Sequence, residues 1–258
     1  MKKTLHKLAT MAVLLVGMVS VFPGIAQLKP SNNMKKKILF VLTSHNKKGD
    51  TGQPTGYYLG EVSHPWEVLH EAGYEIDFVS PKGGKAPVDG FNLEDATNRK
   101  FWENAEYRYK VEHTLTPADI NPEAYAAIFY AGGHGAMWDF ADNTALADIA
   151  AKIYQNNGIV AAVCHGPAGL VNIKLSDGKY LVDGKHINAF TNEEEIAVGL
   201  EKVVPFALET QLIARGAKFE KSGLWQSHVA VDNRVITGQN PQSAKAVGEA
   251  MKKSLSEL

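Results

Sequence analysis

The sequence predicts an α/β protein, a flavodoxin-like three-layer sandwich in which helices cover both faces of a mostly parallel sheet. Short aliphatic runs alternate along the chain with longer segments of helical periodicity, and this order is typical of parallel sheets. One aliphatic run, residues 159–163, is apolar at every position, as expected of a central strand buried on both faces. It leads through Cys164-His165-Gly166-Pro167 into a predicted helix, so the pattern indicates a nucleophile elbow.

The first half of the chain supplies three of the predicted strands. The elements expected there are a strand over 38–44, a helix over 60–72, a strand over 74–81, a helix near 93–105 and a strand over 126–130. Residues 82–123 are polar and irregular and are too many for a simple connection. We therefore expect this segment to form a cap-like insertion.

The second half continues the alternation. A helix is expected over 143–156, where apolar residues recur with the 3.6-residue period. Two Asp-Gly pairs within 174–190 are turn signals that predict a hairpin. A helix over 206–214, two short strands within 228–237 and a final helix over 241–255 complete the expected domain.

Residues 1–26 have the composition of a secretory signal peptide. Three lysines and no acid precede an apolar run from Leu8 to Phe22, and small residues at Gly24 and Ala26 suit a cleavage site. The run is shorter than the ~20 residues that span a bilayer. We expect a protein that is exported to a periplasm or secreted, with no stable membrane span after cleavage; an uncleaved anchor is the alternative. A flexible lead-in over 27–35 would precede a single domain over 36–258.

The composition excludes several classes of protein. Removal of residues 1–26 takes away three of 27 basic residues and none of 28 acidic ones, which leaves a net charge of −4. That balance offers no basic surface for a nucleic acid. A single cysteine cannot form an internal disulfide, so the fold depends on a core drawn from its 45% hydrophobic residues. A single unpaired thiol is unusual in an exported protein and indicates that the cysteine has a role of its own.

Cys164 is the candidate nucleophile. At the carboxyl edge of the sheet and beside a helix N-terminus, its thiolate is expected to be favoured over the thiol. The alternative is a buried cysteine that packs as a small hydrophobe. His165 follows directly and is a candidate general base, unless only its backbone N–H matters.

Two further positions are candidates for the same site. Gly133 lies in the Gly-Gly-His-Gly segment 132–135, and its N–H together with that of His165 forms a candidate oxyanion hole. The alternative there is an ordinary glycine turn at the end of a strand. Glu61 follows the loop of the first strand, and is either a solvated acid at a helix end or a carboxyl group beside the thiol with a raised pKa.

Three consecutive acids, Glu193, Glu194 and Glu195, follow Asn192. Asn192 with Glu195 three residues later is predicted to form a capping box, and acids in a first turn complement the helix dipole. One of the three is also a candidate to orient His165 as the third member of a triad.

These motifs together resemble the ThiJ/PfpI superfamily, whose fold is also that of class I glutamine amidotransferases. The closer resemblance is to its chaperone-like branch, identified with glyoxalase III. The resemblance covers residues 36–258 and is carried by four segments: 55–65 (TGYYLGEVSHP), 131–135 (AGGHG), 161–167 (AAVCHGP) and 236–241 (ITGQNP).

The resemblance implies a role for each candidate residue. Cys164 corresponds to the family's nucleophile, His165 to its adjacent histidine and Glu61 to the glutamate after the first strand. Alignment of the Phe-Thr pair at 190–191 favours Glu195 as the triad acid. Ala162 stands where amidotransferases carry glycine, and no downstream His-Pro-Glu is present, so glutamine hydrolysis is not implied.

The implied activity is that of a glyoxalase III, or D-lactate dehydratase, a cysteine-dependent lyase. It would convert methylglyoxal or a related 2-oxoaldehyde to the 2-hydroxy acid through a Cys164 hemithioacetal, without glutathione, metal or organic cofactor. Its partner would be a small reactive aldehyde in detoxification under stress, and a homodimer is compatible with the resemblance. The alternatives are a holdase chaperone that binds unfolded client proteins, and a cysteine amidase, peptidase or deglycase of the same fold.

Overall fold

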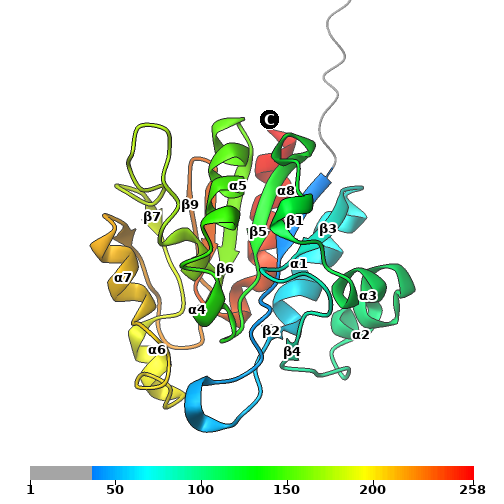
Figure 1. The fold of residues 1–258 in the computed structure, drawn as a ribbon, viewed down its shortest axis with the longest axis horizontal. Helices are drawn as coiled ribbons and strands as arrows, with labels where there is room; N and C mark the ends of the chain where they lie inside the picture. The colour runs from blue at the N-terminus through cyan, green and yellow to red at the C-terminus, as the bar shows by residue number, and fades with distance from the viewer. Residues whose placement is uncertain (1–36) are drawn as a thin grey trace, which may run out of the picture. The chain divides into compact units, whose positions relative to one another are not determined.

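The central feature of the computed structural model, which describes residues 37–258, is a six-stranded sheet (Figure 1). The strand order is β3-β1-β5-β6-β10-β9, in which all neighbours are parallel except the edge pair β10 and β9. The strands are β1 (Lys37–Val41), β3 (Glu75–Val79), β5 (Tyr125–Tyr130), β6 (Ile159–Val163), β9 (Val229–Asp232) and β10 (Val235–Gly238). The five parallel strands follow the flavodoxin-like order, so the predicted fold class is confirmed.

Helices cover both faces of this sheet, because successive side chains of each buried strand point to opposite sides. Ile38 and Phe40 of β1 pack with the apolar residues of α1 (Leu59–Glu71) and α8 (Ala244–Ser256). Leu39 and Val41 belong to the other half of the core, with α5 (Thr144–Gln155). Figure 1 shows α5 and α8 on opposite sides of the strands.

The segment 82–123 contains two helices where the sequence predicts one. α2 (Ala96–Glu103) and α3 (Ala105–Glu112) meet at Asn104, whose side-chain oxygen accepts hydrogen bonds from the first backbone N–H groups of α3. The same segment contributes β4 (Val88–Asp89), which pairs with β2 (Tyr57–Tyr58), and two short 3-10 helices, Pro117–Asp119 and Pro122–Ala124. A function of this segment as a cap stays a prediction.

The hairpin predicted within 174–190 forms only at its first turn signal, where Lys174 and Tyr180 make an antiparallel bridge. β7 (His186–Ile187) instead pairs in parallel with β8 (Lys218–Phe219), a partner that the local turn signals could not reveal. Between them lie α6 (Asn192–Ala197) and the predicted helix α7 (Leu208–Ala214).

The loops that follow β1, β5, β6 and β10 leave the sheet at its carboxyl edge, where open α/β sheets bind ligands. The short helix α4 (Ala136–Asp139) begins in the loop after β5, and a 3-10 helix, Gly166–Leu170, follows β6. Among residues 37–258, no helix is both long enough and apolar enough to cross a membrane. The predicted signal peptide (1–26) and lead-in (27–35) lie outside the described residues.

Candidate active site

The turn after β6 has the geometry of a nucleophile elbow. Cys164 has φ 59°, in the left-handed region that non-glycine residues seldom adopt. Its backbone N–H donates to Gly238 O at 2.9 Å, and its carbonyl accepts from Phe190 N–H at 2.8 Å, so two distant segments hold the turn. A Cβ at position 166 would overlap the Tyr130 carbonyl, which explains the need for Gly166.

His165 lies between Cys164 and Glu195 and contacts both. Its Nδ1 is 3.3 Å from Cys164 Sγ, and its Nε2 is 2.9 Å from Glu195 Oε2. Burial lowers the pKa of His165 to about 4. Burial alone would raise the pKa of Glu195, but hydrogen bonds from His134 and His165 outweigh it and lower that pKa to about 2. At neutral pH the carboxylate therefore accepts the Nε2 proton of a neutral imidazole, which leaves the Nδ1 lone pair facing the sulfur.

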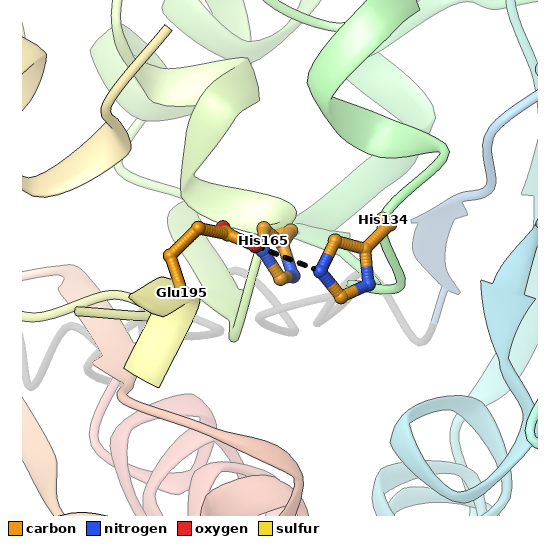
Figure 2. A group of neighbouring side chains, drawn as sticks. All are labelled: His134, His165 and Glu195. Carbon is orange, nitrogen blue, oxygen red and sulfur yellow. Dashed lines mark hydrogen bonds and ion pairs between the residues drawn. The ribbon is translucent and has the colours of Figure 1, made fainter. Parts of the chain in front are cut away.

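A second imidazole, that of His134, shares the same carboxylate. Its Nε2 is 3.0 Å from Glu195 Oε1, and its ring centroid is 4.1 Å from that of His165. Figure 2 shows the three side chains converging, with His134 coming from the loop after β5. The sequence did not identify His134 as a site residue. It lies within the Gly-Gly-His-Gly motif, in which a role was predicted only for Gly133.

The capping of α6 determines which of the three glutamates faces His165. This capping differs from the predicted one. The capping box is formed by Thr191 and Glu194, one residue earlier than the predicted Asn192 and Glu195. Glu194 is buried and accepts hydrogen bonds from Thr191 and from three groups of the loops around 225 and 240. Glu193 is exposed and pairs with Lys221 at 3.1 Å. Of the three acids, only Glu195 is hydrogen-bonded to His165.

Glu61, in the first turn of α1, is fully buried beside the thiol. The Gly132 N–H and the Cys164 thiol lie beside its carboxyl, but neither carboxyl oxygen makes a well-formed hydrogen bond. Burial raises the pKa of Glu61 to about 8. The carboxyl group is therefore protonated at neutral pH, which agrees with the second of the two alternatives for this residue.

The pKa of the Cys164 thiol contradicts the expectation from the elbow. Burial, and then the adjacent Glu61, raise this pKa well above its ordinary value, although the backbone N–H groups of Gly133 and His165 act in the opposite direction. The turn continues into a five-residue 3-10 helix and not into an α-helix, so the dipole that was expected to favour thiolate is small. The resting sulfur is a thiol that needs a base.

The two predicted oxyanion donors lie near the sulfur. The backbone N–H groups of Gly133 and His165 are close enough to the Cys164 thiol to favour its ionised form. Gly133 has φ 100°, and a Cβ there would overlap the backbone of Gly56 and Tyr58. Only glycine allows this close approach.

Two aromatic side chains to which the sequence assigned no role in the site lie beside His165. The Phe190 ring lies 4.4 Å from that of His165, and Trp225 lies 5.8 Å beyond Phe190. Glu195 and Phe190 also border a cavity of about 100 Å³, whose other lining residues are Thr191, Asn192, Ile196, Glu201, Val204, Ala207 and Leu208. Phe190 and Glu195 thus belong both to the site and to the wall of this cavity.

Known proteins match most of the chain. Residues 55–253 match the model of the DJ-1/PfpI family. The chain is 34% identical over 224 residues to "Glutathione-independent glyoxalase HSP31" of Saccharomyces cerevisiae, a match that covers 81% of this chain and 93% of the yeast protein.

Two solved structures show the same fold. Glyoxalase III from Candida albicans superposes with a TM-score of 0.79 at 30% identity, over 84% of this chain and 96% of the other. The Rapid Encystment Protein 24 kDa of Francisella tularensis superposes with a TM-score of 0.82 at 40% identity, over 85% of this chain and 98% of the other.

Proposed function

Because the chain belongs to the DJ-1/PfpI family, we propose that it is a glutathione-independent glyoxalase of the glyoxalase III type. Its relatives with that name match most of its length at 30–34% identity. The observation that carries the proposal is the chain of contacts from Cys164 Sγ through His165 to Glu195, next to the buried carboxyl of Glu61. The substrate is methylglyoxal or a related 2-oxoaldehyde, and the product is the 2-hydroxy acid.

In the first step, Cys164 Sγ attacks the aldehyde carbon while its proton passes to His165 Nδ1. The 3.3 Å contact places the base, and Glu195 stabilises the imidazolium that forms. The developing oxyanion is held by the N–H groups of Gly133 and His165 and takes the proton of the Glu61 carboxyl. The product is a neutral hemithioacetal, with Glu61 ionised and His165 protonated.

In the second step, the hydrogen on C1 moves to C2. The proton held by His165 passes to Glu61, which returns His165 to its neutral form. His165 then removes the C1 proton as the C2 carbonyl oxygen is protonated by Glu61, and an enediol forms. Reprotonation at C2 by His165, with loss of the C1 hydroxyl proton to Glu61, gives a thioester. C1 has been oxidised and C2 reduced, so no external electron carrier is needed.

In the third step, a water molecule hydrolyses the thioester. The C–S bond breaks, the 2-hydroxy acid leaves and the Cys164 thiol is restored. The overall change is the addition of one water molecule to the 2-oxoaldehyde, which balances the reaction without glutathione.

Turnover of methylglyoxal by the purified protein, without glutathione and with lactate measured as product, tests the proposal. Cys164→Ser should reduce lactate formation to background while the thermal unfolding temperature stays close to that of the wild type, since serine is nearly isosteric. Ser243→Ala, which removes a buried hydroxyl at the end of the 3-10 helix Pro241–Ser243, is a control for changes outside the site and should retain turnover. Undiminished turnover in Cys164→Ser would refute the mechanism.

A further inference from the structure

We propose that His134, His165 and Glu195 also form a binding site for a divalent transition-metal ion such as Zn²⁺, and that an ion bound there inhibits the enzyme. These three side chains offer two imidazole nitrogens and one carboxylate, each able to supply a ligand atom. Two histidines and one carboxylate are a ligand set that zinc and neighbouring transition metals accept. The binding itself does not depend on the proposed function; the inhibition does.

The spacing of the ligand atoms suits a metal ion. The ligand atoms of the three side chains lie within 4.8 Å of one another. The two hydrogen-bonded pairs, from Nε2 of His134 and of His165 to the carboxylate, measure 3.0 and 2.9 Å. Ligands bound at ~2.0–2.1 Å with tetrahedral or octahedral angles are roughly 2.9–3.4 Å apart. The two short contacts are already at that spacing, so an ion can replace the two shared protons once the three side chains draw together around it.

The group is accessible from one side. His134 has 16% of its side-chain surface exposed and Glu195 has 9%, whereas His165 is fully buried. An ion would thus enter past His134 and reach Nε2 of His165 last. Cys164 lies on the Nδ1 side of the His165 ring, at 3.3 Å, so its sulfur is not positioned to join the same three ligands.

A metal ion at this position is incompatible with the proposed catalysis. The hydrogen bond from His165 Nε2 to Glu195 is what leaves the Nδ1 lone pair facing the sulfur. If the ion takes the Nε2 lone pair, a neutral imidazole carries its proton on Nδ1. Nδ1 then faces Cys164 as a donor and cannot accept the thiol proton, so the metal and the reaction exclude each other.

Metal binding is tested first without turnover. Chelator-treated Cys164→Ser protein, which lacks a thiol that could bind the ion, is titrated with ZnCl₂ by calorimetry and with CoCl₂ by visible absorption. One ion per chain is expected, with cobalt bands of a low-coordinate site. His134→Gln in the same background should bind roughly tenfold or more weakly, since even partners outside the ligand shell contribute that much.

The matched control is His186→Gln, because His186 is an exposed histidine that pairs with Glu220 at 2.6 Å, away from the triad. It should leave the affinity unchanged. Thermal unfolding without metal confirms that each variant is folded. Equal affinity in the His134→Gln protein, or no binding up to millimolar ZnCl₂, would overturn the site.

Inhibition is tested with the wild-type enzyme. Zinc should suppress methylglyoxal turnover at the concentration at which it binds, and a chelator should restore the activity. Binding without inhibition would overturn the inhibitory role. If the wild type has no turnover without zinc, the glyoxalase proposal fails, while the calorimetric and cobalt measurements still decide whether the metal site exists.

Discussion

Glu61→Gln should stabilise the folded protein at neutral pH and slow methylglyoxal turnover. Glu61 is fully buried. Only the Gly132 N–H and the Cys164 thiol are placed to favour its ionised form by hydrogen bonding. Burial raises its pKa from the ordinary 4.5 to about 8. The unfolded chain therefore loses this proton at a much lower pH than the folded chain does. At neutral pH, folding requires the Glu61 carboxylate to bind a proton.

The direction and size of the effect follow from this difference. For a carboxyl group whose folded pKa is raised, its contribution to stability is fully present below pH 4.5 and is lost as the pH rises toward 8. Each pH unit in this window costs about 1.4 kcal/mol, which amounts to about 3 kcal/mol at pH 7. Glutamine has nearly the same shape and no titratable proton, so Glu61→Gln should gain about this amount at pH 7 and nothing at pH 4.

Denaturant unfolding of wild type and variant between pH 4 and pH 9 measures the difference. The two stability curves should coincide near pH 4 and separate steadily up to pH 8. Glu71→Gln is the matched control, since Glu71 ends the same helix with 61% of its side chain exposed. It should keep the wild-type pH dependence. If the Glu61→Gln curve runs parallel to the wild-type curve, or lies below it at pH 7, then the carboxyl is not a buried neutral acid and the role assigned to it as a proton donor fails.

Three other predictions follow from the acids and the N-terminus. Glu195→Gln should lower turnover roughly 100-fold or more, because it weakens the support of His165, whereas the exposed Glu193→Gln should have little effect; equal loss in steady-state assays would mean that the triad acid is wrong. Glu194→Gln should cost about 2 kcal/mol or more in denaturant unfolding, since it breaks a buried network that includes Thr191; an unchanged midpoint would refute that role. Protein recovered from the cell envelope should begin at or near Gln27 by mass spectrometry, and a full-length chain in the cytosol would contradict export.

The sequence by itself determined the fold class and most of the site. Buried strands and periodic helices are each recognised from a short stretch of sequence, and their alternation along the chain predicts the parallel sheet. The elbow at Cys164 was predictable for the same reason: a fully apolar strand, a glycine and a proline lie within nine residues, 159–167. The motifs themselves indicated Gly133 and His165, and the resemblance then indicated Glu61 and Glu195. The structure brings these residues together at one edge of the sheet.

The tertiary structure determined the features that depend on residues far apart in the sequence. The parallel pairing of β7 with β8 joins segments about thirty residues apart, so the turn signals within 174–190 could not reveal it. Three adjacent glutamates have similar local propensities, and only the packing of α6 against the loops around 225 and 240 gives Glu194 the capping role and Glu195 the histidines. The pKa of Cys164 was predicted in the wrong direction, because a local sequence shows a helix terminus but not the burial and the carboxyl group that raise that pKa.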